Sequence, residues 1–422
     1  MRGRHASGGP PQRARTELGS QEEFRMTAAD RGPANGAVQA ACTICGGEVR
    51  SVIDLPAFPI TGVYLRPGDP LPPHVSMDQA LLHCGACGHA QLANMLPPDA
   101  LYGSTYGFRT SESTSSKAGT EFFIQFLDRV AGQRQFNHAL DVGCNDLHLL
   151  RRLEGRAVAR TGIDPILSRE DASESEIQAI GSTVEETDLT TLAGGPVDLV
   201  LCRHTLEHIA QPRAVVQALV ENTAEDGLLV FESPGFDRLL ARHRFDQIFH
   251  EHLQYFSRSS FFRLLMETGA QYVAHAENPH HWGALLVAFK RGGRRSASPD
   301  APAPRRADIE ARYETFQRHA RATRQMLQVA DTPVVGYGAA QMLPSLAYHF
   351  SGFGPMQVIV DDDAGKDGCR YPGMDLVVRT PSSMPEWSRG TVVVTALDAV
   401  DPILRKLLGE RPRNIILPLS QF

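Results

Sequence analysis

The chain has 422 residues and a formal net charge of −6 at pH 7. This length predicts two or three domains with enough apolar core to fold without disulfides. The sequence contains no basic block suited to a nucleic-acid backbone and no apolar run near the ~20 residues that span a bilayer. We therefore expect neither nucleic acid nor a membrane as a partner.

Residues 1–40 are predicted to form a disordered N-terminal extension. They are rich in Gly, Pro, Arg, Ala and Ser and lack the apolar stretch of a secretory signal. Four acidic residues, Glu17, Glu22, Glu23 and Asp30, argue against an acid-poor transit peptide. We therefore expect a cytoplasmic protein.

The next segment, residues 41–104, holds two CxxC pairs, Cys42 with Cys45 and Cys84 with Cys87. Two intervening residues let both sulfurs of a tight turn point toward one centre, and two such turns make the tetrahedral S₄ site that zinc prefers. Two disulfides or four buried thiols are the alternatives, and zinc is favoured because nothing else indicates an oxidising compartment. Four thiolates leave no position for water, so the zinc is expected to be structural.

Residues 105–290 are predicted to form an α/β domain. Residues 121–130 have helical spacing, and residues 138–143 have the pattern of a short buried strand. Strands and helices alternate from there, which is typical of a parallel sheet with crossover helices. Further strands are predicted to end near residues 164, 202 and 232.

The end of the first predicted strand carries a candidate cofactor site. Gly143, in the same turn as Asn145, lets a ligand approach the backbone, and Asp141 can hold this turn or accept from an ammonium group. Asp164, about 20 positions after the turn, is placed to accept both hydroxyls of a ribose. NAD and S-adenosylmethionine sites share this combination. The short turn lacks a full GxGxxG and fits the methyl donor better, because that donor has no pyrophosphate to bind.

After the strand that ends at residue 202, the sequence reads Arg203-His204-Thr-Leu-Glu-His208-Ile. A strand followed by a short polar stretch and LEHI resembles small-molecule class I methyltransferases, and this resemblance implies a S-adenosylmethionine-binding fold. Such enzymes usually carry a further glycine at the position of Leu147. The side chain of Leu147 either points into the core or weakens cofactor binding.

The most distinctive stretch is residues 244–257, RFDQIFHEHLQYFS. Two further patterns follow, GYGA at 336–339 and VDDD at 360–363. Together with the CxxC pairs and LEHI, they resemble the sugar C-methyltransferase family, which installs methyl branches on nucleotide-activated keto-deoxysugars for antibiotics. The resemblance implies an α/β protein of three parts: a zinc module, a class I methyltransferase core that binds S-adenosylmethionine, and a C-terminal Rossmann-like substrate domain over residues 307–422, after a linker at 291–306.

The resemblance also implies a reaction and its site. A nucleotide-linked keto-deoxysugar or a related small metabolite is methylated on carbon, which requires a base to form an enolate and a donor or cation to stabilise the oxyanion. Glu251 and His252 match the family's active-site pair, and His208 matches the histidine after its third sheet strand. His204 stands where the family often has Asn and is grouped with the donor-binding residues.

We expect His252, with His250 or Tyr106, to handle the proton and Glu251 to orient it. Helical spacing would place Phe249 and His252 on one face and Glu251 on the next. His252 and Glu251 would then frame a pocket. The family often has Tyr at the position of Phe249, and a phenylalanine cannot take a proton. This departure suggests that the substrate, or the accepting atom, has changed.

Two alternatives remain open at this level. The first is an O- or N-methyltransferase acting on another small acceptor, which is favoured by the missing phenol at Phe249. Trp282 separately fills space that a glycine of the family would leave open. The second is a non-catalytic or NAD-binding, dehydrogenase-like protein, with Leu147 blocking the donor site and the GYGA turn at 336–339 binding NAD. A monomer or a small homo-oligomer is expected.

Overall fold

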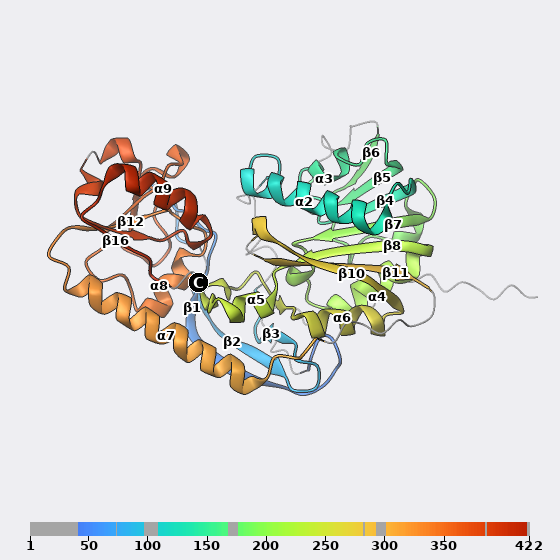
Figure 1. Cartoon of the computed structure of the whole chain (residues 1–422), viewed down its shortest axis with the longest axis horizontal. Helices are drawn as coiled ribbons and strands as arrows, with labels where there is room; N and C mark the ends of the chain where they lie inside the picture. Colours follow the sequence, from blue (N-terminus) through green and yellow to red (C-terminus); the bar gives the residue numbers. More distant parts are fainter. Residues whose placement is uncertain are drawn as a thin grey trace, which may run out of the picture.

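The computed structural model describes residues 41–72, 74–96, 109–167, 176–281, 283–292, 301–384 and 386–419. Its strands form three sheets of four, seven and five strands (Figure 1). The predicted extension at 1–40, together with Tyr106 and Trp282, lies outside the described residues. None of the described helices is both long and apolar enough to cross a membrane.

The seven-stranded sheet belongs to the middle part of the chain. Its order is β10-β11-β8-β7-β4-β5-β6; β11 is antiparallel to both neighbours and the other pairs are parallel. The strands are β4 Phe136–Val142, β5 Ala157–Ile163, β6 Ile177–Ile180, β7 Val197–Arg203, β8 Thr223–Ser233, β10 Ala270–Asn278 and β11 Ala284–Arg291. The predicted strands are confirmed, whereas the sequence pattern does not reveal β6, because a run of four residues at a sheet edge is too short to show a period.

Helices cover both faces of this sheet (Figure 1). Phe123 and Phe126 of α2 and Leu150 of α3 pack on one face, and Val216 of α4 and Phe262 of α6 pack on the other. The apolar runs of the central strands are nearly continuous because both faces are buried. The helices of this part are α2 Thr114–Ala131, α3 His148–Arg151, α4 Pro212–Asn222, α5 Phe236–Ala241 and α6 Arg258–Glu267.

The four-stranded sheet carries the cysteine pairs. It is antiparallel in the order β1-β2-β3-β9, with β1 Val49–Pro59, β2 Ser76–Cys84, β3 Ala90–Leu92 and β9 Gln254–Tyr255. Strand β9 belongs to the distinctive stretch 244–257, so a segment from the middle part of the chain completes the sheet of the zinc module.

The helical spacing expected for Phe249, Glu251 and His252 is wrong. A short 3₁₀ helix, η4 Phe245–Gln247, precedes these residues, and the chain then runs through a turn into β9. The backbone N–H of Leu92 donates to the carbonyl oxygen of Leu253 at 2.9 Å, next to the β3–β9 pairing. Pairing with a distant strand overrides the local spacing here, because tertiary context outweighs intrinsic preference.

The C-terminal part is a five-stranded parallel sheet in the order β14-β13-β12-β15-β16. In chain order this is 3-2-1-4-5, which confirms the expected Rossmann-like domain. Its elements are α7 Arg306–Gln328, β12 Val334–Tyr337, α8 Leu343–Phe350, β13 Val358–Val360, β14 Val377–Arg379, β15 Thr391–Val394, α9 Val400–Glu410 and β16 Asn414–Ile416.

Further 3₁₀ helices are η2 Leu189–Thr191, η3 Leu206–His208, η5 Pro279–His281, η6 Ala364–Lys366, η7 Pro381–Ser383, η8 Trp387–Arg389 and η9 Leu397–Ala399.

A single hydrophobic core joins the three parts. It contains Phe58 from β1, Phe245 from η4, Phe316 from α7 and Leu343 from α8, all fully buried. The long helix α7 runs along the outside of the zinc-module sheet toward the C-terminal sheet (Figure 1). The parts are therefore packed against one another, and a site formed between them has fixed walls.

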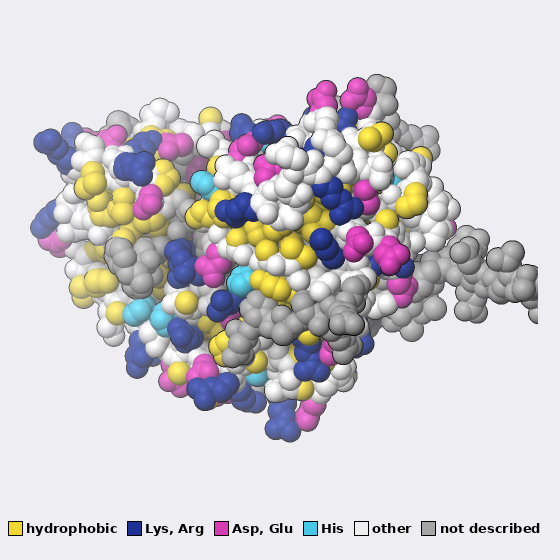
Figure 2. Space-filling model, turned by 45° about the vertical axis from the view of Figure 1, so that its right-hand side comes forward, with side chains coloured by type: hydrophobic (Ala, Val, Ile, Leu, Met, Phe, Trp, Pro, Cys, Tyr) yellow, Lys and Arg dark blue, Asp and Glu magenta, His cyan; other side chains and the backbone are white. Residues whose placement is uncertain are grey.

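Charges of both signs are interspersed on the face drawn in Figure 2, with groups of hydrophobic side chains between them. Binding to a nucleic-acid backbone uses a stripe or patch of one positive sign. The mixed pattern on this face agrees with the expectation from the sequence, and the statement that nucleic acid is not a partner stays a prediction.

Candidate active site and zinc site

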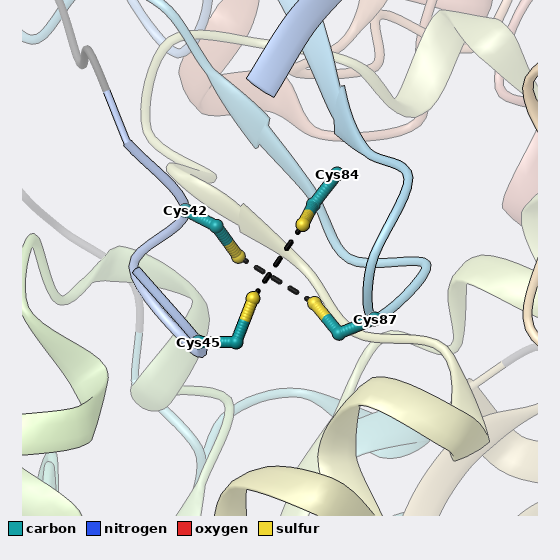
Figure 3. Close-up of side chains that lie close together, drawn as sticks. All are labelled: Cys42, Cys45, Cys84 and Cys87. Carbon is teal, nitrogen blue, oxygen red and sulfur yellow. Dashed lines mark hydrogen bonds between the residues drawn. The ribbon is translucent and has the colours of Figure 1, made fainter. Parts of the chain in front are cut away.

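The four predicted zinc ligands come together at one end of the four-stranded sheet (Figure 3). Their sulfur atoms all lie within 4.8 Å of one another, and the Cys42–Cys87 and Cys45–Cys84 pairs are each 3.5 Å apart. A tetrahedral site with Zn–S bonds of 2.3 Å has sulfurs about 3.8 Å apart, whereas a disulfide requires about 2.05 Å. The thiols are free, so the geometry fits zinc, and four sulfur ligands make the site structural.

A buried glutamine ties the zinc loops to the middle part of the chain. The side-chain oxygen of Gln254 accepts a hydrogen bond from Thr43 Oγ1 at 2.8 Å and lies 2.9 Å from His89 Nε2. Its amide nitrogen donates to the carbonyl oxygen of Ile209 at 3.0 Å. Thr43 lies between the first two zinc ligands, so the position of the zinc loop is coupled to the segment that contains His252.

One cavity of about 1920 Å³ is lined by all three parts. Its walls include Tyr64 from the zinc module, Asp141 and His252 from the middle part, and Lys366 from the C-terminal part. Pockets that bind one small ligand usually measure roughly 300–1,000 Å³. The cavity therefore has room for a cofactor and a second ligand at the same time.

Asp141 and Gly143 line this cavity directly after β4. A Cβ atom on Gly143, which has a φ of +74°, would lie 1.9 Å from Thr205 Oγ1, so the loop after β7 admits only glycine there. Asp141 is 2 % exposed, and its Oδ1 has no hydrogen bond among the described residues. Burial raises the pKa of Asp141 to about 7, with Arg203 opposing the shift.

Asp164 lies at the end of β5 and faces the same cavity. Its carboxylate accepts hydrogen bonds from the backbone N–H of Asn145 at 2.8 Å and of Ile166 at 3.0 Å. Burial raises the pKa of Asp164, although these two N–H groups oppose the shift. Asn145 in turn accepts from the backbone N–H of Thr110 at 3.0 Å, so the turn after β4 is held from both sides.

Leu147 follows in this turn with a left-handed backbone, at φ +61° and ψ +11°. Glycine adopts this conformation without strain, whereas other residues pay roughly 1–2 kcal/mol. The side chain is 1 % exposed and packs in the core beside Leu149 and Leu150. It is absent from the cavity lining over the residues that the structure covers, so the expectation that Leu147 points into the core is confirmed and the blocked donor site is wrong.

His204 belongs to a buried cluster of charges at the end of β7. Arg203 Nε donates to Glu232 Oε2 at 2.6 Å, and the ring nitrogens of His204 lie 3.5 Å from Glu207 and 3.7 Å from Glu232. Burial alone would lower the pKa of His204, but the two carboxylates outweigh it and raise the pKa to about 9. The ring also lies 4.6 Å from that of His281. His204 therefore lines the cavity as one member of a charge cluster.

Glu251, His208 and His252 form a second group in the cavity lining. His208 Nδ1 lies 2.8 Å from the carbonyl oxygen of Glu251, and the ring of His252 packs 4.0 Å from Phe249 and 4.9 Å from His208. The Glu251 carboxylate lies 3.5 Å from Gln341 Nε2 of the C-terminal part. Burial raises the pKa of Glu251 to about 7 and lowers the pKa of His252 to about 3.

His250 is not brought to this group. Its Nδ1 lies 3.2 Å from Gln79 Nε2 and its Nε2 lies 3.0 Å from the carbonyl oxygen of Phe58, so both ring nitrogens contact the zinc-module strands. It is 1 % exposed and is not among the described residues that line the cavity. Of the proton carriers expected from the sequence, His250 thus has a structural position, and Tyr106 lies outside the described residues.

Two protein families match this chain. A methyltransferase domain matches residues 117–275, and a zinc binding domain matches residues 42–102. The chain thus contains a methyltransferase domain and a zinc binding domain. Both matches agree with the sheet topologies and with the cysteine cluster, and the α/β fold expected from the sequence is confirmed.

The chain is also similar to curated proteins. It is 26% identical over 253 residues to the C-methyltransferase NovU of Streptomyces niveus, over 58% of this chain and 59% of that protein. It is 28% identical over 115 residues to the ubiquinone biosynthesis O-methyltransferase of Bordetella avium (strain 197N), over 26% of this chain and 48% of that protein. The chain thus spans about half the length of these relatives. The two domains and the first relative confirm the resemblance to the sugar C-methyltransferase family.

Solved structures are similar over less than half of the chain. The N-methyltransferase NodS of Bradyrhizobium japonicum WM9 is 17% identical and covers 42% of this chain and 98% of its own, with a TM-score of 0.33. A 1,6-didemethyltoxoflavin-N1-methyltransferase of Burkholderia thailandensis is 11% identical and covers 43% and 80%, with a TM-score of 0.33.

The residues after β4 and β5 fit S-adenosylmethionine. The open, buried Oδ1 of Asp141 suits an ammonium group. Gly143 lines the cavity, and Thr205 occupies the position that a side chain at residue 143 would take. Asp164 has lone pairs left for ribose hydroxyls beyond its two backbone bonds. All five residues expected to hold the donor, Asp141, Gly143, Asn145, Asp164 and His204, line the cavity.

Sequence reasoning missed part of the candidate site. Residues 182–186, which follow the unpredicted strand β6, line the cavity, as do Arg66 and Arg242. Glu207 stands inside the LEHI motif, yet only the structure shows its carboxylate buried in the cavity wall. The signal for Glu207 was present in the motif, whereas the two arginines lie in stretches without a recognisable pattern.

Proposed function

We propose that this methyltransferase transfers the methyl group of S-adenosylmethionine to a carbon of a nucleotide-linked keto-deoxysugar or a related small metabolite. The observation that carries the proposal is that one cavity is lined both by the donor-binding residues and by Glu251, His208 and His252. The similarity to a C-methyltransferase supports the choice of carbon as the accepting atom.

Carbon methylation requires a base, and we assign this role to Glu251. Its carboxylate faces the cavity, has only the amide of Gln341 as a side-chain neighbour at 3.5 Å, and has no cation within 4.0 Å in the described part of the chain. A carboxylate without a cationic partner keeps its lone pairs available for the proton on the carbon next to the carbonyl. This reverses the roles expected from the sequence, in which His252 handled the proton and Glu251 oriented it.

The wall formed by His208 and His252 is assigned to the acceptor's carbonyl oxygen, where the oxyanion develops. The contact with the carbonyl oxygen of Glu251 places the proton of His208 on Nδ1, so Nε2 of His208 carries the lone pair, and His252 packs edge-on against the same ring. S-adenosylmethionine supplies the electrophilic methyl group, and Asp141, Gly143 and Asp164 hold it. The shape of the cavity then brings acceptor and donor together and excludes water from the carbanion.

Two arginines in the cavity wall support a nucleotide-linked acceptor. Both Arg66 and Arg242 line the cavity, and no ion pair joins either guanidinium group to a carboxylate among the residues that the structure describes. Arginine binds phosphate oxygens in bidentate fashion. Lys366 is nearby on the C-terminal part but is held by Ala339 O at 3.1 Å and Asp361 at 3.7 Å. Lys366 and Asp361 thus both contact Ala339 in the GYGA turn. Because these groups bind one another, the turn is better suited to cover a substrate than to bind NAD.

Exchange of the acceptor's own hydrogen tests the proposal. A nucleoside-diphosphate 4-keto-6-deoxyhexose is incubated in D₂O with the enzyme and S-adenosylhomocysteine, and deuterium at the carbon next to the carbonyl is followed by NMR. We expect enzyme-dependent exchange that Glu251→Gln lowers by at least about 100-fold while S-adenosylhomocysteine still binds. The exposed substitution Glu277→Gln serves as the matched control and is expected to exchange as the wild type does.

Methylation of oxygen is the second candidate. It is favoured by the O-methyltransferase relative and by Phe249, whose ring lies against His252 without a phenol. A wild-type enzyme that methylates a hydroxyl group and catalyses no exchange would replace carbon with oxygen as the accepting atom.

A further inference from the structure

Glu207, His208 and His252 form a second group of metal-ligating side chains, separate from the four cysteines. One carboxylate oxygen and one ring nitrogen of each histidine all lie within 4.8 Å of one another. Glu207 and His208 come from η3 after β7, and His252 comes from the turn before β9. All three line the cavity, so an ion held between them would face a ligand inside it.

The carboxylate of Glu207 is buried without a permanent cation. It is 1 % exposed, Oε2 accepts a hydrogen bond from Ser233 Oγ at 2.9 Å, and Oε1 has no hydrogen bond among the described residues. Arg203, the nearby permanent cation, binds Glu232 at 2.6 Å instead. Oε1 also lies 3.5 Å from Nδ1 of His204, a ring that Glu232 shares at 3.7 Å. Buried carboxylates are paired with a cation or coordinate a metal, and Glu207, which shares His204 with a second carboxylate, lies in the cavity wall.

The two histidines have the orientation of metal ligands. His208 Nδ1 lies 2.8 Å from a backbone carbonyl oxygen, which fixes the proton on that nitrogen and the lone pair on Nε2. Histidines that bind metals generally donate their second N–H to a carbonyl or carboxylate in this way. The ring of His252 is held between Phe249 and His208 at centroid distances of 4.0 and 4.9 Å, so its orientation is set by packing.

We propose that Glu207, His208 and His252 bind a divalent transition-metal ion. Two imidazoles and one carboxylate are a common ligand set for catalytic zinc and for other first-row metals, and three protein ligands leave positions open to a substrate. The ion's role rests on the proposed function: it polarises the acceptor's carbonyl oxygen and stabilises the enolate while Glu251 takes the proton. The C–H bond of the acceptor breaks and its proton goes to Glu251. The enolate carbon then bonds to the methyl group as the sulfur–methyl bond of S-adenosylmethionine breaks, and S-adenosylhomocysteine leaves with that electron pair.

Manganese distinguishes this site from the cysteine site, because Mn²⁺ prefers oxygen and nitrogen ligands and thiolates select zinc. The full-length protein is dialysed against a chelator until one zinc per chain remains, Mn²⁺ is titrated in, and free Mn²⁺ is counted by EPR. We expect the wild type to bind one Mn²⁺ per chain. Glu207→Gln and His252→Gln are expected to weaken binding by about 100-fold or more, and Glu251→Gln, the same change at an adjacent carboxylate, is expected to retain it.

Wild-type protein that binds no Mn²⁺, or Glu207→Gln that binds it as the wild type does, would overturn the proposal. Pulsed EPR of wild-type protein with Mn²⁺ gives a second readout that needs no variant. Couplings to imidazole nitrogen support the proposal, and their absence contradicts it even where a variant fails to fold. Neither EPR measurement uses an acceptor, so both are independent of the D₂O exchange test of the proposed function. A protein that catalyses exchange but binds no Mn²⁺ refutes only the metal site. A protein that binds Mn²⁺ but catalyses no exchange refutes only the C-methylation chemistry.

Discussion

At the scale of single residues, Asp141 presents a buried carboxyl group whose charge Arg203 compensates only in part. Burial raises its pKa to about 7. A donor that brings an ammonium group to this carboxyl stabilises the ionised form, so binding releases a proton below pH 7. We expect the affinity for S-adenosylhomocysteine, measured by calorimetry, to rise between about pH 6 and pH 8 and then to level off.

Asp141→Asn removes the titrating group without changing its shape. The variant is expected to bind S-adenosylhomocysteine more weakly and with an affinity that is flat over the same pH range. A wild-type affinity that does not change between these pH values would contradict the assigned contact between Asp141 and the ammonium group.

Single residues also show how far motifs predict a site. The turn after β4 could be read from the sequence, because Gly143 and the acidic residues occupy strand ends that local pattern reveals. The different positions of His250 and His252 could not be read from the sequence, because His250 contacts the carbonyl oxygen of Phe58, which lies 192 positions away. The strained backbone of Leu147 was equally hidden, since its core partners are known only once the sheet is assembled.

At the scale of elements, the two-residue strand β9 links the zinc module to the methyltransferase part. Gln254 in this strand makes buried hydrogen bonds to Thr43, His89 and Ile209. Gln254→Ala would leave these groups without partners, at a cost of about 2–5 kcal/mol in the free energy of unfolding. Chemical denaturation measures this loss, and faster zinc release to a chelator is expected with it.

Gln325→Ala is the matched control for this prediction, because Gln325 is exposed on α7. Its effect is expected to stay within about 0.5 kcal/mol. Equal stability of the two variants would show that the Gln254 bonds do not hold the zinc module in place.

Elements were predicted well where one stretch of chain decides them. The helix α2, the central strands and the Rossmann-like C-terminal part follow local periodicity. The prediction of helical spacing for the segment leading into β9 was wrong, because the extended form of this segment depends on pairing with β3. The residues around Glu251 likewise contact three parts of the chain. Tertiary packing brings these parts together, and no local sequence pattern predicts it.

At the scale of the whole molecule, the zinc is expected to shape the acceptor side of the cavity. The zinc module supplies Tyr64, Arg66 and Met95 to the cavity wall, whereas the donor-binding residues belong to the seven-stranded sheet. Removal of zinc, by chelation or by Cys42→Ser with Cys87→Ser, should therefore abolish turnover of the acceptor and preserve binding of S-adenosylhomocysteine. Calorimetry and a turnover assay on the same preparation measure both.

Cys369→Ser, which lies outside the zinc cluster, controls for the loss of a thiol and should leave the zinc content unchanged. Zinc-free protein with full turnover would mean that the module keeps its shape without the metal. Loss of donor binding together with turnover would mean that the module also supports the seven-stranded sheet.

The place of β9 has a consequence for the order in which the chain can fold during synthesis. His89 and Gln254 bond to each other across 165 positions, so the ribosome must deliver most of the chain before the zinc-module sheet receives its last strand. Until then β3 presents an unpaired edge, which invites pairing with another chain. Zinc can hold the two cysteine loops together early, but a fragment that ends at residue 104 would keep that edge open and would tend to aggregate.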